Sequence, residues 1–181
     1  MRGAEAVLRT ATLLGRKVVV KERLAKRYRE PSLDRRLRRE RTRSEAKLLH
    51  RAKAAGVPCP VVLAVDEFSI TMGFLSGARP KMGREDAHEA GRMLARLHGA
   101  SIIHGDYTPA NLIRDDKTLY VIDFGLGYVS GDVEDQAVDV FTMLRAISQK
   151  DAFVAGYRSN PNAAAVLERV KKVEKRVRYA L

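Results

Sequence analysis

The stretch that decides the fold is His104-Gly105-Asp106-Tyr107-Thr108-Pro109-Ala110-Asn111, which is followed shortly by Val121-Ile122-Asp123-Phe124-Gly125. Asp106 and Asn111 stand five positions apart in a polar loop, and Asp123 comes directly after a short apolar run. Carboxylate and amide oxygens are the ligands that Mg²⁺ prefers, and protein-bound Mg²⁺ commonly accompanies phosphates. The spacing therefore predicts an oxygen-rich site for a metal and a phosphate.

The order of these residues is typical of kinases. Phosphoryl transfer uses one carboxylate to orient the nucleophile, and an Asp and an Asn to hold the metal. We therefore expect Asp106 to be catalytic, Asn111 and Asp123 to bind Mg²⁺, and ATP to be the cosubstrate. A single Asp-Phe-Gly or His-Gly-Asp tripeptide is a weak signal. All the pieces in this order, with a predicted hairpin between them, rarely coincide by chance.

The same chemistry requires a lysine on an upstream strand and a glutamate on the helix after it. Lys21 ends the β-branched run Val18-Val19-Val20, which favours a strand. On the long helix that follows, Glu45 and Glu40 are both possible partners. Glu45 lies four residues before Leu49 and shares its apolar face, whereas Glu40 sits among arginines. The sequence thus favours Lys21 and Glu45, both as parts of the nucleotide site.

Two further segments are candidates for contact with the nucleotide. Met72-Gly73-Phe74-Leu75 follows the last predicted strand of the first half, where a kinase has its hinge. We expect the backbone of Gly73 and Leu75 to meet adenine, and Met72 to line the pocket. The usual glycine-rich loop is reduced to Gly3-Ala4-Glu5-Ala6, in which Gly3 allows the backbone to approach phosphates.

The remaining pattern supplies the architecture. Strands are predicted over 16–21, 61–65, 68–72, 112–113 and 119–122. Helices are predicted over 33–55, with Ser32 as N-cap, over 84–98, and as two or three helices broken at Pro161 within 132–181. This order predicts an α+β, minimal two-lobed protein-kinase-like fold. We expect one domain over 1–181, with an N-lobe of 1–73 and a helical C-lobe of 74–181 that ends in a basic tail.

The 181 residues carry 34 Lys and Arg against 22 Asp and Glu, a net charge of +12. The charge is concentrated in segments 21–43 and 169–178, and it suggests a polyanionic partner. The alternative is a set of solvated helix faces in a charge-rich, thermally stable protein. The single cysteine excludes a disulfide framework and a cysteine-based zinc site. No signal peptide or membrane-length apolar run is present, so we expect a cytoplasmic protein without membrane contact.

A further set of motifs carries a family resemblance. They are Lys21-Glu22-Arg23, Lys26-Arg27-Tyr28-Arg29-Glu30-Pro31, Leu33-Asp34 and Arg41-Thr42-Arg43-Ser44-Glu45-Ala46. In these the chain resembles the small atypical protein kinase of the KEOPS complex, of the PRPK type, in its short archaeal form. The resemblance covers nearly the whole chain. It departs at Val177, where the family's basic tail has a glycine, and at Gly73, where the family usually has an acidic residue.

The resemblance implies a Mg-ATP-dependent serine/threonine kinase or ATPase. Its implied partners are the KEOPS subunits, chiefly the transferase that makes threonylcarbamoyl-adenosine in tRNA, and tRNA itself through the basic segments. It also implies that Gly3 and Glu5 belong to the loop over the nucleotide, and that Asp139 braces the catalytic loop.

Two other functions stay open on the sequence. A small-molecule phosphotransferase of the aminoglycoside or choline type would need a helical insert after Asp123, and little chain remains for one. A tRNA- or protein-binding scaffold would keep the kinase core only as structure. The presence of every metal- and phosphate-binding residue type counts against that scaffold.

Overall fold

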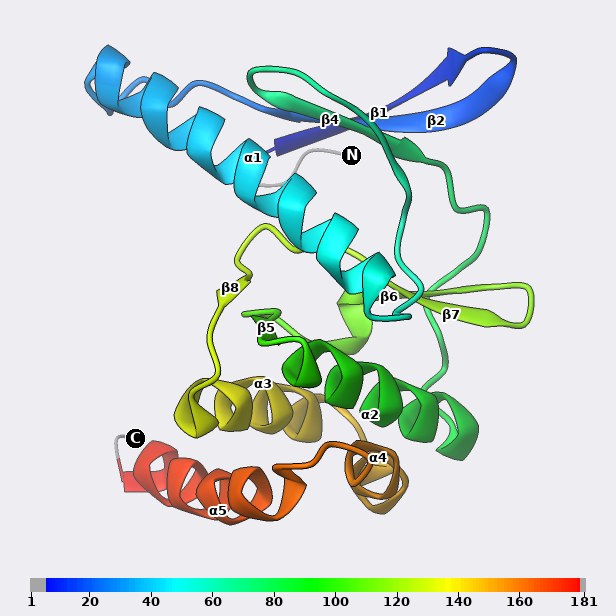
Figure 1. Cartoon of the computed structure of the whole chain (residues 1–181), viewed down its shortest axis with the longest axis vertical. Coiled ribbons are helices and arrows are strands. Elements are labelled where there is room, and N and C mark those ends of the chain that lie inside the picture. Colours follow the sequence, from blue (N-terminus) through cyan, green and yellow to red (C-terminus); the bar gives the residue numbers. More distant parts are fainter. Residues whose placement is uncertain (1–5, 180–181) are drawn as a thin grey trace.

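The structure, a computed structural model, describes residues 6–179. Its first part is a four-stranded antiparallel sheet with the strand order β1-β2-β4-β3 (Figure 1). The strands are β1 (Ala6–Leu13), β2 (Arg16–Arg23), β3 (Val62–Val65) and β4 (Ser69–Gly73). In this register Lys21 pairs with Leu8 on one side and Ile70 on the other. Lys21 is thereby fixed on a central strand.

One long helix, α1 (Pro31–Ala54), runs between β2 and β3 and lies diagonally beside the sheet (Figure 1). It begins two residues earlier than predicted because Glu30, not Ser32, is its N-cap. The Glu30 carboxylate accepts hydrogen bonds from the backbone N–H groups of Ser32 and Leu33. This satisfies two of the donors that a helix start leaves unpaired.

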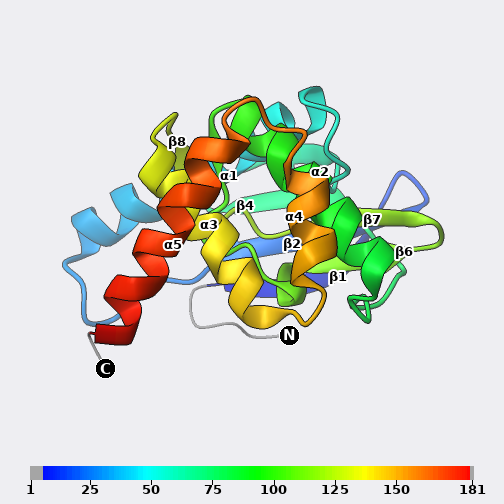
Figure 2. The same cartoon turned by 90° about the horizontal axis from the view of Figure 1, so that it is seen from below.

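The second part is mainly helical (Figure 2). Its helices are α2 (Arg84–Gly99), α3 (Val133–Ala146), α4 (Lys150–Tyr157) and α5 (Ala163–Tyr179), with a 3-10 turn η1 (Pro109–Asn111). Two small antiparallel pairs accompany them, β5 (Ile102–Ile103) with β8 (Tyr128–Val129), and β6 (Leu112–Asp115) with β7 (Thr118–Val121). The predicted hairpin and the break at Pro161 are present. Neither β1 nor β8 was predicted as a strand.

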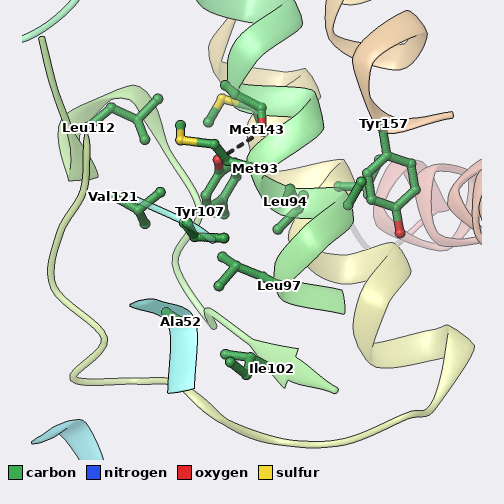
Figure 3. Packing of buried hydrophobic residues seen from close by; sticks show 14 of the residues in the cluster. Ala52, Met93, Leu94, Leu97, Ile102, Tyr107, Leu112, Val121, Met143 and Tyr157 are labelled. Carbon is green, nitrogen blue, oxygen red and sulfur yellow. Dashed lines mark hydrogen bonds between the residues drawn. The ribbon is translucent and has the colours of Figure 1, made fainter. Parts of the chain in front are cut away.

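A single apolar cluster joins the two parts. It extends from Ala52 on α1 through Leu97 on α2 to Met143 on α3 (Figure 3). Its large members include Tyr107, whose buried hydroxyl donates to the Ala90 carbonyl at 2.9 Å. Full burial of a large apolar side chain contributes roughly 1.5–3 kcal/mol. The loop segment that contains Tyr107 is therefore anchored to α2 by both packing and a hydrogen bond.

Helices α2 and α4 touch through two glycines. A Cβ atom added to Gly91 would lie 2.1 Å from the Phe153 carbonyl oxygen, and one added to Gly156 would lie 2.0 Å from the His88 carbonyl oxygen. The two helices therefore approach backbone to backbone, at a distance that any larger residue would prevent.

No helix within residues 6–179 is long and apolar enough to cross a membrane.

Candidate active site

The centre of the site is a pair of buried charges from the sheet and α1. The Lys21 Nζ atom lies 2.6 Å from Glu45 Oε1, and Arg23 Nη2 lies 2.6 Å from Glu45 Oε2. The Glu45 side chain is only 2% exposed. A buried carboxylate is costly unless it is paired and hydrogen-bonded, and here both oxygens have cationic donors. Of the two candidate partners, Glu45 is thus the one in contact with Lys21. Glu40 is exposed and lies 4.0 Å from Arg36.

The fourth charge is Asp123, which follows β7. Its Oδ1 atom lies 2.7 Å from Lys21 Nζ and accepts a hydrogen bond from the Gly125 N–H at 3.2 Å. Asp123 has a φ of 61°, a conformation that a residue with a side chain rarely adopts. Partial burial alone would raise the pKa of this carboxyl, but the Lys21 charge and the hydrogen bonds outweigh it and lower the pKa. Asp123 is therefore held ionised beside Lys21.

Asp106 and Asn111 form a second contact in the loop before β6. The Asn111 Nδ2 atom donates to the Asp106 backbone oxygen at 2.8 Å and to its carboxylate Oδ2 at 2.9 Å. Because η1 turns the chain back over these five residues, the two side chains meet despite an irregular backbone. The Asn111 amide thus orients the exposed carboxylate of Asp106.

The loop itself is held by one buried residue of α3. Asp139 accepts from the backbone N–H of His104 at 2.6 Å and of Gly105 at 2.9 Å. It also lies 3.3 Å from His98 Nε2, whose other ring nitrogen contacts the Tyr157 hydroxyl at 2.7 Å. Hydrogen bonds to a buried carboxylate are stronger than neutral ones. Asp139 therefore fixes the backbone of the two residues that precede Asp106. This is the supporting role that the family resemblance implies for Asp139.

His104 is a buried ring within this loop. Its Nε2 atom lies 3.0 Å from the Ile122 carbonyl oxygen, and its Nδ1 lies 3.3 Å from the Asp106 N–H. These partners assign the proton to Nε2 and the acceptor role to Nδ1. Burial lowers the pKa of His104, and the opposing charge of Asp139 does not reverse this. A neutral ring thus links the loop that carries Asp106 to Ile122, directly before Asp123.

A pocket opens beside the charged cluster. Lys21, Glu45 and Asp123 lie on its wall together with Gly73. The rest of its lining is apolar and comes from both parts of the chain: Leu8, Val19, Leu49, Pro60, Met72, Leu75, Ile113 and Ile122. Such a pocket, apolar with a few convergent polar groups, is typical of small-molecule sites. A nucleotide suits this pocket, because its planar base would contact the apolar lining and its charged phosphates would lie near Lys21 and Asp123.

The donor set also suits Mg²⁺ that is bound partly by phosphates. No group of three or more His, Cys, Asp or Glu side chains is arranged to hold a metal between residues 6 and 179. Mg²⁺ usually takes only one or two protein carboxylates and completes its shell with phosphate and water. Asp123, with its side chain 52% exposed, and Asn111 are of the required chemical types.

The structure brings together most of the residues expected from the sequence. Lys21, Glu45, Met72, Gly73, Leu75 and Asp123 line one pocket, and Asp106 contacts Asn111. Gly3 and Glu5 lie outside the described residues. Sequence reasoning missed Leu8, because the strand that carries it was not predicted. It also missed the contact of Arg23 with Glu45, which the two-residue period of a strand could have suggested, since Arg23 shares a face with Lys21.

Comparison with known proteins agrees with this geometry. Residues 8–143 match the RIO domain family. The chain is 45% identical over 172 residues to the "Probable serine/threonine-protein kinase BUD32 homolog" of Archaeoglobus fulgidus, with 90% of this chain and 88% of the relative covered. It is 40% identical to the "Probable bifunctional tRNA threonylcarbamoyladenosine biosynthesis protein" of Methanosarcina acetivorans, with 92% of this chain and 32% of that protein covered. The chain thus spans about a third of the bifunctional relative.

Solved structures show the same fold. The Rio2 kinase of Chaetomium thermophilum, in a complex described as ADP/Mg²⁺-phosphoaspartate, matches with a TM-score of 0.70 at 18% identity, covering 99% of this chain and 69% of that one. WaaP in complex with acyl carrier protein matches with a TM-score of 0.62 at 16% identity, covering 97% and 86%. The predicted kinase-like α+β fold is therefore confirmed.

Proposed function

Because the chain belongs to the RIO domain family and is 45% identical over 172 residues to a BUD32 homolog, we propose that it is an ATP- and Mg²⁺-dependent atypical serine/threonine kinase or ATPase of the KEOPS complex. Its role would be to support threonylcarbamoyl-adenosine modification of tRNA, the process named for the bifunctional relatives. The observation that carries this proposal is the joint contact of Lys21 with Glu45 and Asp123 at the wall of an apolar pocket.

Each part of the pocket has a role in nucleotide binding. The apolar walls would enclose the adenine, and the Gly73 carbonyl and the Leu75 backbone would supply hydrogen bonds to its edge, because the Gly73 N–H already donates to the Val61 carbonyl at 2.9 Å. The Lys21 ammonium would contact the α- and β-phosphates, and Glu45 would hold it in position. Glu45 is well suited to this task because Arg23 holds its second oxygen.

The chemical step uses the loop residues. Asp106 accepts the proton of the attacking hydroxyl, from water or from a serine or threonine, as the terminal phosphoryl group is transferred and ADP leaves. Asn111 keeps the Asp106 carboxylate pointed at that proton. Asn111 and Asp123 would hold Mg²⁺, which neutralises charge on the phosphoryl oxygens.

The surroundings of the site favour this function over a small-molecule phosphotransferase. Only seven residues, 126–132, separate Gly125 from the start of α3, and no helix lies among them. Such an enzyme would need an inserted helical region here to enclose its substrate. The proposed physiological partners are the transferase subunit and tRNA.

The test is Mg-ATP hydrolysis by the purified protein, alone and with the transferase and tRNA. Asp123→Ala serves as the blank, and Asp66→Ala, an exposed residue in the turn between β3 and β4, serves as the matched control. Turnover that rises with the partners, vanishes in the blank and persists in the control would support the proposal. Equal turnover in the blank would overturn the site. Tight partner binding without turnover in any mixture would favour a scaffold.

A further inference from the structure

Two buried polar side chains outside the nucleotide pocket connect α4 to the loop that carries Asp106. They are His98 on α2 and Tyr157 on α4. Helix α4 lies beyond α2 as seen from the sheet (Figure 1), and neither side chain lines the pocket. Nucleotide binding therefore does not explain why two hydrogen-bonding groups are buried here.

Tyr157 reaches α2 because the two helices approach backbone to backbone. Gly156, its neighbour in the chain, lies against the His88 carbonyl of α2. The Tyr157 ring belongs to the buried apolar cluster (Figure 3) and stands edge-on to the His98 ring, with the ring centroids 5.6 Å apart. The Tyr157 hydroxyl oxygen lies 2.7 Å from His98 Nδ1. The packing of α4 on α2 thus fixes the position of this hydroxyl.

The partners of the His98 ring determine which of its nitrogens carries the proton. Nε2 lies 3.3 Å from Asp139 Oδ2, and both Asp139 oxygens accept backbone N–H groups of the loop. A carboxylate oxygen in this setting is an acceptor, so we assign the proton to Nε2. Nδ1 is then the acceptor, and the Tyr157 hydroxyl donates to it. Burial raises the pKa of Tyr157, and the Asp139 charge adds to this, so the hydroxyl keeps its proton.

The contact of His98 with Asp139 supports a carboxylate that already holds the loop. Asp139 accepts the His104 N–H through Oδ2 and the Gly105 N–H through Oδ1. At 3.3 Å the His98 bond is long for a hydrogen bond, so its direction matters more than its strength. It approaches Oδ2 from α2, a third element, and so opposes rotation of the carboxylate away from the loop. In the other tautomer, the Nε2 lone pair would face Oδ2 and repel it.

We propose that His98 and Tyr157 are positioning residues for phosphoryl transfer. The Tyr157 hydroxyl keeps the proton on His98 Nε2, and Nε2 holds Asp139 in the orientation that fixes the loop before Asp106. The effect on turnover rests on the proposed function, whereas the hydrogen bonds themselves do not. The packing of α4, far from the nucleotide pocket, thereby determines where the Asp106 carboxylate lies.

The first test compares the turnover number and the nucleotide affinity of three variants of the full chain. Tyr157→Phe removes only the hydroxyl. His98→Asn loses the donor at the Nε2 position, whereas His98→Gln places an amide N–H there. We expect the first two to lower the turnover number by about 10- to 100-fold, since a small displacement of a reacting group costs up to about 100-fold. Nucleotide affinity should stay at the parental value, and His98→Gln should restore part of the turnover.

The matched controls make the same changes at exposed positions. His88→Asn alters an exposed histidine on the same helix, and Tyr28→Phe removes the hydroxyl of a tyrosine that is 77% exposed. Both controls are expected to keep the parental turnover. Thermal unfolding of every variant shows that it is folded. A lower melting temperature with parental turnover in Tyr157→Phe and His98→Asn would limit the pair to stabilising the fold and overturn the proposal.

The second test does not depend on activity. In a nitrogen-15 NMR spectrum of the histidine rings, His98 should carry a proton on Nε2 and none on Nδ1. Tyr157→Phe should populate the other tautomer and shift the amide proton signals of His104 and Gly105, which Tyr28→Phe should leave unchanged. A proton on Nδ1 in the parental protein, or unchanged loop signals in Tyr157→Phe, would contradict the proposal.

The two tests separate this proposal from the proposed function. If the parental protein hydrolyses no ATP while the expected tautomer and loop shifts are found, the catalytic function is wrong and the hydrogen-bonded connection from α4 to the loop stands. If the parental protein hydrolyses ATP and the Tyr157 and His98 variants do so equally well, the catalytic function stands and the positioning role is wrong.

Discussion

The Lys21 ammonium lies 2.7 Å from the Asp123 carboxylate, although 102 positions separate the two residues in the chain. The same ammonium lies 2.6 Å from Glu45 on α1. One cation thus connects the sheet, the long helix and the segment that follows β7. The site therefore forms only when all three elements are in place. The effect of each residue on catalysis and its effect on the stability of the fold can be measured separately.

Replacing Asp106 by Asn is expected to lower the rate of ATP hydrolysis or phosphoryl transfer by about 100- to 10,000-fold, the range for loss of a proton-accepting group. The substitution keeps the shape of the side chain but removes its capacity to take a proton. Nucleotide affinity should stay near the parental value, because Asp106 does not line the pocket. Steady-state kinetics and nucleotide titration measure the two effects.

The control for this variant is Asp116→Asn, in the turn between β6 and β7. Asp116 has a φ of 51°, a conformation that Asn tolerates, so the same chemical change should be silent there. Parental turnover in Asp106→Asn would remove Asp106 from the mechanism.

Replacing Glu45 by Gln is expected to lower the free energy of unfolding by about 3 kcal/mol, because Lys21 and Arg23 lose a buried counter-charge. Urea denaturation measures the change. The exposed Glu40→Gln variant should change stability by no more than about 0.5 kcal/mol, as for other surface pairs one helical turn apart. Equal effects in the two variants would contradict the assignment of Glu45.

Protonation of His104 should make the fold sensitive to acid. Burial keeps the pKa of His104 below its usual 6.5 in the folded protein. The unfolded chain binds the proton near pH 6.5 while the folded chain does not, so the free energy of unfolding falls as the pH drops below that value. The slope is at most about 1.4 kcal/mol per pH unit.

The measurement for His104 is twofold. Its ring signals in an NMR titration should show no protonation at pH 6.5, and His104→Gln should lose the corresponding part of the acid sensitivity. A ring that titrates at 6.5 or above in the folded protein would show this account to be wrong.

Replacing Asp139 by Asn is expected to lower the free energy of unfolding by at least about 2 kcal/mol, because two backbone donors lose a buried charged acceptor. The turnover number should fall more than nucleotide affinity changes, since the affected loop carries Asp106. Asp151→Asn is the control, because its ion pair with Arg84 is largely exposed and such surface pairs contribute little to stability. A variant with parental turnover would limit Asp139 to a structural role.

Cys59 should be inert in the folded protein. It is 1% exposed, and burial raises the pKa of its thiol to about 11. Thiolate is the reactive form, so a disulfide reagent should modify the native protein slowly and the urea-unfolded protein at once. Rapid modification under native conditions would show that the segment between α1 and β3 opens readily.

Much of the fold follows from local signals in the sequence. The apolar period of α2, the β-branched run of β2 and the turn between β6 and β7 place these elements within a few residues of their observed bounds. β1 was missed because most of its eight residues are exposed. Without a buried face, a strand shows no alternation of apolar and polar residues in the sequence. β8 has only two residues, too few for any periodicity.

The candidate site was predictable to a similar extent. The spacing of Asp106, Asn111 and Asp123 identified the chemistry, and the helical face of Glu45 selected the partner of Lys21. The contact of Arg23 with Glu45 and the pocket position of Leu8 depend on tertiary packing between β2, α1 and β1. The two-residue period of β2 places Arg23 on the same face as Lys21, but only the packing of these elements shows that Arg23 reaches Glu45 and that Leu8 reaches the pocket. The predicted N-cap at Ser32 was wrong. Serine is a favoured N-cap residue, but the Glu30 carboxylate accepts the hydrogen bonds of the first helical N–H groups instead.

The glycine contact between α2 and α4 has a mechanical consequence. An interface made of backbone has no rotamers with which to repack, so Gly91 and Gly156 should tolerate no substitution, and the helices cannot slide past each other. The Tyr107 hydroxyl fixes the catalytic loop to this rigid pair through Ala90. If the entry of a ligand rearranges the protein, we therefore expect the α2–α4 pair to stay fixed and the movement to occur in elements outside it, such as the sheet and α1.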